Sequence, residues 1–157
     1  MNALREPEAQ RVDMIQHALG KLPAVECPLV HRFTPGLYTR EIFMPAGTAI
    51  VSRIHKTEHP YVVLTGRALV WTAEAGVVTL TAGAVGITKP GTRRVLYVTE
   101  DCRWLTFHPT TETDMDKLQA ELTDTPDVSY FDGGDVGPVE GADILNQLRD
   151  AAEKGEL

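Results

Sequence analysis

The sequence is poor in cysteine and has no long hydrophobic run. Its 157 residues include two cysteines, Cys27 and Cys102, which form no C-x-x-C pair and cannot build a disulfide framework. We therefore expect free thiols in a reducing cytoplasm. The first residues contain no apolar segment typical of signal peptides, and no run approaches the ~20 apolar residues of a membrane helix. A phosphate-binding glycine loop, a zinc ribbon and a Ser-His-Asp series are also absent.

Negative charge is abundant but unevenly distributed. The net charge is -7, and residues 112–157 carry 13 acidic and 3 basic side chains. Residues 31–110 carry 9 basic and 5 acidic side chains. The overall charge argues against non-specific nucleic-acid binding. The basic middle segment can still attract a small anion.

Short segments rich in β-branched residues, separated by Pro-Gly and Gly turns, predict an all-β fold. Two of the predicted turns are Thr65–Gly66 and Thr99–Asp101. The predicted strands cover residues 37–44, 48–55, 61–64, 67–72, 77–81, 84–88, 93–98 and 102–108. Their number and close spacing are typical of a β-sandwich or a small barrel.

Helical patterns flank this β region. Apolar residues at helical spacing predict helices over 7–19, 113–122 and 142–154, and Thr113 with Asp116 resembles a capping box for the second. We expect an N-terminal helix and extended segment over 1–30, a barrel over 31–110, and an acidic helical tail with a Gly/Asp/Pro-rich linker over 111–157.

Three histidines and one glutamate are candidate metal ligands. His55 and His59 stand four residues apart, so a regular strand would place them on one face. Glu58 or His108 could be the third ligand, because imidazole and carboxylate sets suit a divalent transition metal such as Zn, Fe, Ni or Mn and leave positions open for a ligand. The alternative is that the histidines are hydrogen-bonded around a barrel mouth without a metal.

Basic residues in the same region suggest another interpretation. Arg53, Arg93 and Arg94, with Lys56 and Lys89, could line a basic opening. Guanidinium groups bind carboxylate and phosphate through two parallel hydrogen bonds, so a metal-free pocket could sequester an anionic metabolite or nucleotide. The alternative is that Arg93 and Arg94 point to opposite faces and that one of them pairs with Glu100, Asp101 or the acidic tail.

Two blocks of the sequence resemble the conserved blocks of the cupin superfamily, G-x5-H-x-H-x3,4-E-x6-G and G-x5-P-x-G-x2-H-x3-N. The residues that carry the resemblance are Pro45-Ala46-Gly47, His55, His59 and Gly66, followed by Gly83 and Lys89-Pro90-Gly91. The segments VECPLVHRF, PGLYTREIFMPAG, IHKTEH, KPGTRR and WLTFHPT resemble, more narrowly, small single-domain cupin-like proteins of tailed bacteriophages and prophages. The resemblance implies a cupin-like jelly-roll barrel with short helices at both ends.

The sequence departs from the cupin pattern at the metal-ligand positions. Arg53 stands where the first histidine is usual, His59 where the glutamate is usual, and Arg94 where the histidine of the second block is usual. His55 matches the second histidine of the first block. The resemblance therefore implies an altered site, for which His55, His59 and His108 are the expected metal ligands.

The resemblance also implies a class of function. We expect a phage- or prophage-type protein in the bacterial cytoplasm that binds a small ligand and forms a homo-oligomer, most simply a dimer. In an enzymatic version, Glu58 or Tyr97 would transfer protons beside the metal. The alternative is a structural or interaction module, for example a virion or host-takeover component, that docks through its acidic tail. We expect neither a membrane nor a nucleic acid as a partner.

Overall fold

The computed structural model describes residues 7–20, 25–124, 146, 149–150 and 153. Two helices occur in this part of the chain, α1 (Pro7–Gly20) and α2 (Met115–Leu122). The strands are β1 (Leu29–Thr34), β2 (Leu37–Met44), β3 (Ala49–Val51), β4 (Ile54–His55), β5 (His59–Thr72), β6 (Gly76–Thr81), β7 (Val85–Thr88), β8 (Val95–Pro109) and β9 (Thr123–Asp124).

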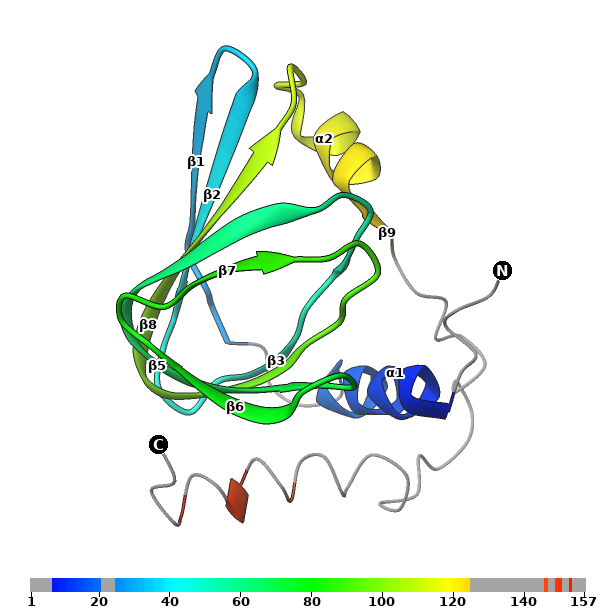
Figure 1. The fold of residues 1–157 in the computed structure, drawn as a ribbon, viewed down its shortest axis with the longest axis vertical. Helices are drawn as coiled ribbons and strands as arrows, with labels where there is room; N and C mark the ends of the chain where they lie inside the picture. The colour runs from blue at the N-terminus through cyan, green and yellow to red at the C-terminus, as the bar shows by residue number, and fades with distance from the viewer. Residues whose placement is uncertain (1–6, 21–24, 125–145, 147–148, 151–152, 154–157) are drawn as a thin grey trace.

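Seven of these strands form one strongly curved antiparallel sheet. Its order is β1-β2-β8-β5-β6, with β3 also paired to β8 and β7 also paired to β5. Figure 1 shows this sheet wrapping around an interior space, and β4 and β9 form a separate two-stranded sheet. The predicted all-β jelly roll with short helices is confirmed.

The structure corrects two predicted turns. Thr65–Gly66 and Thr99–Asp101 do not end strands, because β5 and β8 run through them as strands of 14 and 15 residues. The pairing between these strands shifts register around Gly66, which has a φ of 84°. The glycine therefore forms a β-bulge, which bends a continuous strand without ending it.

Two other local predictions differ from the structure. The strand predicted over 48–55 is divided into β3 and β4, with Ser52 and Arg53 between them. The N-terminal cap of α2 is Asp114, whose carboxylate accepts a hydrogen bond from the Lys117 backbone N–H at 3.0 Å, in place of the expected pair at Thr113 and Asp116. The N-cap aspartate satisfies one exposed N–H group of the helix, and the Glu112 carboxylate accepts from the Asp114 N–H at 2.9 Å, the group that the second residue of a capping box would bind.

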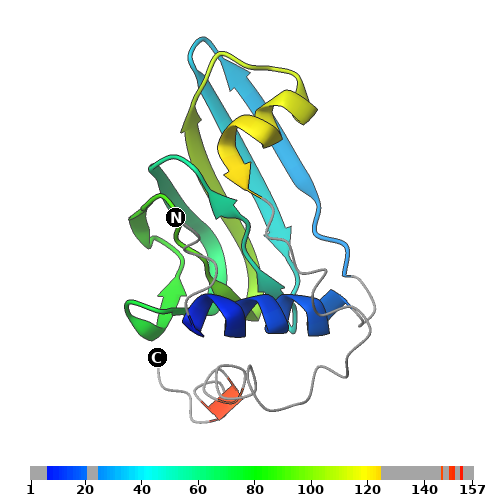
Figure 2. The same cartoon turned by 90° about the vertical axis from the view of Figure 1, so that its right-hand side faces the viewer.

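Each helix covers a different part of the barrel (Figure 2). The predicted N-terminal helix is present as α1, and its Val12 and Ile15 pack against Leu69, Trp71 and Val95. Helix α2 packs two buried leucines against the buried ring of one tyrosine on β2. No helix of the described residues is both long and apolar enough to cross a membrane. The predicted linker and the helix predicted over 142–154 lie almost entirely outside the described residues.

Gly66 provides a test of the bulge. A Cβ atom at this position would lie 2.0 Å from the Asp101 carbonyl oxygen, so Gly66→Ala must displace backbone. We expect a loss of at least about 3 kcal/mol of unfolding free energy, measured by urea denaturation. Gly47→Ala is the matched control, because Gly47 has a φ of 87° but a Cβ added there would meet no atom within 4 Å. The control should lose only about 1 kcal/mol, and equal losses in the two variants would contradict the close approach.

Candidate functional site

The barrel encloses a cavity of about 520 Å³, within the range of small-molecule sites. Strand β2 contributes alternate residues to its wall, and α2 covers it from one side. Its polar wall consists of His31, Tyr38, Arg40, Ser52, Arg53, His55, His59, Thr88, Arg94, Thr106, His108, Gln119 and Thr123. Its apolar and sulfur-bearing wall consists of Val25, Cys27, Leu29, Ile42, Met44, Ile50, Val51, Leu96, Trp104, Met115, Leu118 and Leu122.

Three histidines from three different strands meet in this cavity. His55 ends β4, His59 begins β5, and His108 lies one residue before the end of β8. The ring centroid of His59 is 4.4 Å from that of His55 and 4.4 Å from that of His108. One nitrogen from each ring lies within 4.8 Å of the others, so the three lone pairs can converge on one point.

Hydrogen bonds determine which nitrogen of two of these rings is free. The Nδ1 atom of His59 lies 3.1 Å from the Thr57 carbonyl oxygen, which can only accept, so Nδ1 carries the proton and Nε2 keeps its lone pair. The Thr106 hydroxyl lies 3.5 Å from the Arg40 carbonyl oxygen and 2.9 Å from Nε2 of His108. When the hydroxyl donates to the carbonyl, it accepts from Nε2–H and leaves Nδ1 of His108 unprotonated.

Burial keeps the cluster neutral. It lowers the pKa of His55 to about 4, with smaller contributions from His59 and Arg40. Burial also lowers the pKa of His108 to about 3, and it lowers the pKa of His59. Neutral imidazole is the form that binds metal, so all three rings are in their ligand form at neutral pH.

The donor set therefore fits a divalent transition metal. Nδ1 of His108 is buried and finds no hydrogen-bond partner among the described residues, as expected of a metal-ligating nitrogen. The hydrogen bonds from the other nitrogens of His59 and His108 resemble the outer partners that orient metal ligands. Two nitrogens on one zinc ion lie about 3.4 Å apart, so binding would draw the rings slightly inward.

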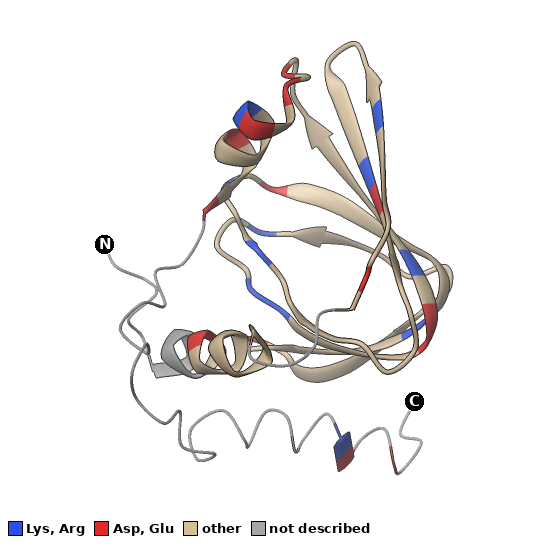
Figure 3. Ribbon diagram, turned by 180° about the vertical axis from the view of Figure 1, so that it is seen from behind, with Lys and Arg blue, Asp and Glu red and all other residues tan. Residues whose placement is uncertain are grey.

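Arginines form the charged part of the wall. Arg40 lies on β2, Arg53 between β3 and β4, and Arg94 just before β8. The Arg94 guanidinium donates to the Thr88 hydroxyl at 3.0 Å and lies over the Tyr61 ring, 5.0 Å from its centroid. Figure 3 shows Lys and Arg positions along the barrel strands and loops, and Asp and Glu positions at α2.

Three residues proposed from the sequence lie away from the cavity. Glu58 is exposed and pairs with Lys89 on the surface, so it is not placed to ligate a metal with His55. Arg93 is buried on the other side of the chain, where it pairs with Asp13 of α1. Tyr97 is not part of the cavity wall. Arg93 and Arg94 thus point to opposite faces, as the alternative interpretation of the sequence predicts, but Arg93 pairs with Asp13, which that interpretation did not name.

Sequence reasoning missed several residues of the wall. Tyr38 and Arg40 stand two residues apart on β2, so the alternation of this strand could have shown that they share one face, opposite to Glu41. Gln119 of α2 could not be identified as a wall residue, because the spacing of apolar residues predicts a helix but does not show where that helix packs on the barrel. His31 also lines the cavity, and its Nδ1 lies 2.7 Å from the Tyr38 hydroxyl.

The sequence matches no family model and no curated protein. Solved structures resemble the fold. The DMSP lyase DddQ of Ruegeria pomeroyi DSS-3 matches with a TM-score of 0.50 and 17% identity over 60% of this chain and 54% of that chain. The salicylate 1,2-dioxygenase of Pseudaminobacter salicylatoxidans matches with a TM-score of 0.50 and 12% identity over 70% of this chain and 33% of that one.

A third similar structure is explicitly a cupin. It is a cupin-2 domain containing protein from Shewanella frigidimarina NCIMB 400, with a TM-score of 0.44 and 11% identity over 61% of this chain and 92% of that one. At these identities the two matches with a TM-score of 0.50 concern the fold alone. The chemistry of this barrel therefore depends on its own residues.

The lowered histidine pKa values predict a pH-dependent stability. Unfolded histidines bind a proton near pH 6.5, whereas folded His55 stays neutral down to about pH 4. Between these values the unfolded state holds more protons, so the unfolding free energy falls as the pH falls, by at most about 1.4 kcal/mol per pH unit for this group. Urea midpoints measured with a chelator should fall less steeply in His55→Gln than in the wild type. Parallel curves between pH 6.5 and 5 would contradict the assignment.

Proposed function

We propose that this cupin-type protein binds a small ligand at a divalent transition metal held by His55, His59 and His108. The observation that carries the proposal is the convergence of three neutral, mostly buried imidazoles, one of which has a buried nitrogen without a partner among the described residues. The rest of the cavity provides room for a small molecule beside them.

The chain's own residues would orient both the metal and the ligand. Thr57 and Thr106 hold His59 and His108 in the tautomers that present free lone pairs. Leu118 and Leu122 of α2 cover the cavity and keep bulk water from that side. A bound metal would act as a Lewis acid on an oxygen of the ligand. The Tyr38 hydroxyl, hydrogen-bonded to His31, lines the same cavity and is a candidate for proton transfer.

Elemental analysis of untagged protein tests the metal proposal. We expect about one equivalent of Zn, Fe, Ni or Mn per chain, as purified or after reconstitution, and a loss of most of it in His55→Ala and His59→Ala. His31→Ala is the matched control, because this histidine lines the same cavity but lies outside the cluster. Equal metal content in the control and in the His55 and His59 variants would contradict the proposal, as would wild-type protein that takes up no metal.

A second pair of variants separates metal binding from folding. Thr106→Val removes the hydroxyl that orients His108 and should weaken metal binding by about 10- to 100-fold, whereas Thr106→Ser keeps the hydroxyl and should restore it. Both variants should retain the far-ultraviolet circular dichroism of the wild type. Equal affinities for Val and Ser would show that this hydrogen bond does not orient the ligand.

We further propose that the protein is a homo-oligomer of phage or prophage type, acting in the bacterial cytoplasm. The phage or prophage type and the cytoplasmic location rest on the sequence resemblance. Support for an oligomer comes from β1, an edge strand whose Leu29, Val30 and Phe33 are 40 to 44% exposed. Sedimentation velocity should give a species of at least twice 17.2 kDa, and Phe33→Glu should dissociate it. A monomer at micromolar concentration would contradict this part of the proposal.

A further inference from the structure

The cavity wall contains three arginines and no acidic residue. Arg40, Arg53 and Arg94 all line it, whereas no Asp or Glu of the described residues does. Within the described part of the chain, no ion pair joins any of these arginines to a carboxylate. Arg40 and Arg94 are partly buried, and Arg53 is exposed at the edge of the wall. A partly buried positive charge without a counter-ion is costly, so two of them beside a third arginine indicate a site prepared for an anion.

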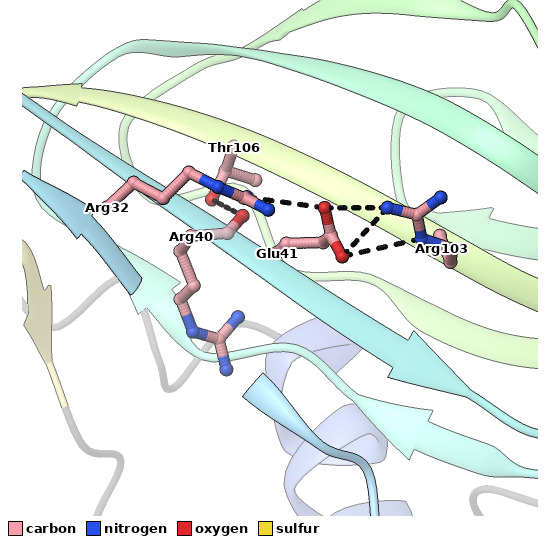
Figure 4. Close-up of polar contacts among 5 residues, drawn as sticks. All are labelled: Arg32, Arg40, Glu41, Arg103 and Thr106. Carbon is pink, nitrogen blue, oxygen red and sulfur yellow. Dashed lines mark hydrogen bonds and ion pairs between the residues drawn. The ribbon is translucent and has the colours of Figure 1, made fainter. Parts of the chain in front are cut away.

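The outer face of the same strands shows how arginines are normally compensated. Glu41 of β2 binds Arg103 at 3.1 Å and Arg32 at 3.3 Å on that face. Figure 4 shows the Arg40 side chain pointing away from this network, and only the Arg40 carbonyl oxygen takes part in a contact drawn there, with Thr106. Adjacent residues of one strand thus give an outer arginine pair that shares one carboxylate and an inner arginine that has none.

Two of the inner guanidinium groups are held in place by neutral partners. Arg94 is oriented by the Thr88 hydroxyl and by the face of Tyr61. The Arg53 guanidinium faces the side-chain amide of Gln119, whose oxygen accepts from it in the amide orientation that satisfies both groups. Neutral partners orient a guanidinium without cancelling its charge, so the groups remain available to an anionic ligand.

The wall also changes character along β2. Tyr38 pairs with His108 at one end of the strand, and Met44 pairs with Cys102 at the other. The inward residues between them are Arg40 and then Ile42, so the wall is cationic beside the histidines and apolar further along. Ile50, Leu96 and Trp104 continue the apolar part.

We propose that the ligand is a small organic carboxylate with an apolar body. Its carboxylate would lie against Arg40, Arg53 and Arg94 beside the histidine cluster, and its body would lie against Ile42 and the apolar wall. Guanidinium forks bind phosphate as well as carboxylate, but the hydroxyl groups of a sugar phosphate would find few partners along the apolar wall. The apolar part of the wall therefore favours a ligand with a hydrocarbon body over a sugar phosphate.

This inference rests on the proposed function, because the carboxylate shares the cavity with the metal. A dication beside three uncompensated arginines is repelled, and a bound carboxylate reduces that repulsion. The metal should in turn attract the carboxylate, since coupling between two binding sites is reciprocal. Carboxylate affinity should therefore be at least about threefold higher in metal-loaded protein than in chelated protein.

The test is calorimetric titration of the full chain with straight-chain carboxylates from butanoate to decanoate, in chelated and metal-loaded protein. We expect saturable binding that strengthens by about fourfold for each added CH₂ group until the apolar part is filled. The corresponding neutral amides, hexanamide and octanamide, should bind at least tenfold more weakly than the acids, and inorganic phosphate should compete only weakly.

Arginine variants identify the binding groups. Arg40→Gln should weaken octanoate binding at least tenfold, and Arg53→Gln, at an exposed position that tolerates substitution, should weaken it measurably. Arg32→Gln is the matched control on the outer face and should leave the affinity within twofold of the wild type. Acids and amides of equal affinity, no saturable carboxylate binding in either metal state, or wild-type affinity in both the Arg40 and Arg53 variants would each overturn the inference.

The outcomes separate this inference from the metal proposal. Arginine-dependent octanoate binding by protein that takes up no metal would support the carboxylate site and overturn the metal centre. Metal bound through the histidines without carboxylate binding would support the metal centre and overturn the carboxylate site.

Discussion

The antiparallel pairing of β8 with β2 on one side and β5 on the other is the constraint on which the site depends. Tyr38 pairs with His108 across β2 and β8, and Tyr61 pairs with Thr106 across β5 and β8. Since β5 and β8 are antiparallel, His59, two residues before Tyr61, lies beside His108, two residues after Thr106. Because side chains alternate, a slip of one residue in β8 would turn His108 outward, and a slip of one residue in β2 would turn Arg40 outward. One register thus creates both the histidine cluster and the cationic wall.

Burial has different consequences for the histidines and for the arginines of the cavity. For the histidines, loss of water favours the neutral ring, which is the form that offers a lone pair. For the arginines, the same loss of water cannot remove the charge, because burial lowers the pKa of Arg40 and Arg94 from a value far above neutrality. The cavity therefore combines neutral imidazole donors, which suit a metal ion, with permanently charged guanidinium groups, which suit an anionic ligand.

Sequence patterns predicted the all-β class, the first helix and β2 because each depends on local alternation or spacing. They also identified His55, His59 and His108, although only the fold could show that the three meet. The predicted turn at Gly66 was wrong because a glycine with positive φ serves a bulge as well as it serves a turn, and only the partner strand distinguishes them. Arg93 was misplaced because its partner, Asp13, lies 80 residues away in a helix whose docking position no local pattern encodes.

The departures from the cupin pattern all change the charge of the site in the same direction, toward positive. In the pattern that the sequence resembles, a glutamate ligand cancels one positive charge of a divalent metal. Here the equivalent residue is the neutral His59, and arginines occupy two further positions where neutral histidines are usual. A metal in this cavity would therefore lack any counter-charge from the described wall, and an enclosed site screens such repulsion poorly. An anionic ligand would supply that counter-charge, so the proposed metal and the proposed carboxylate would balance each other in a single site.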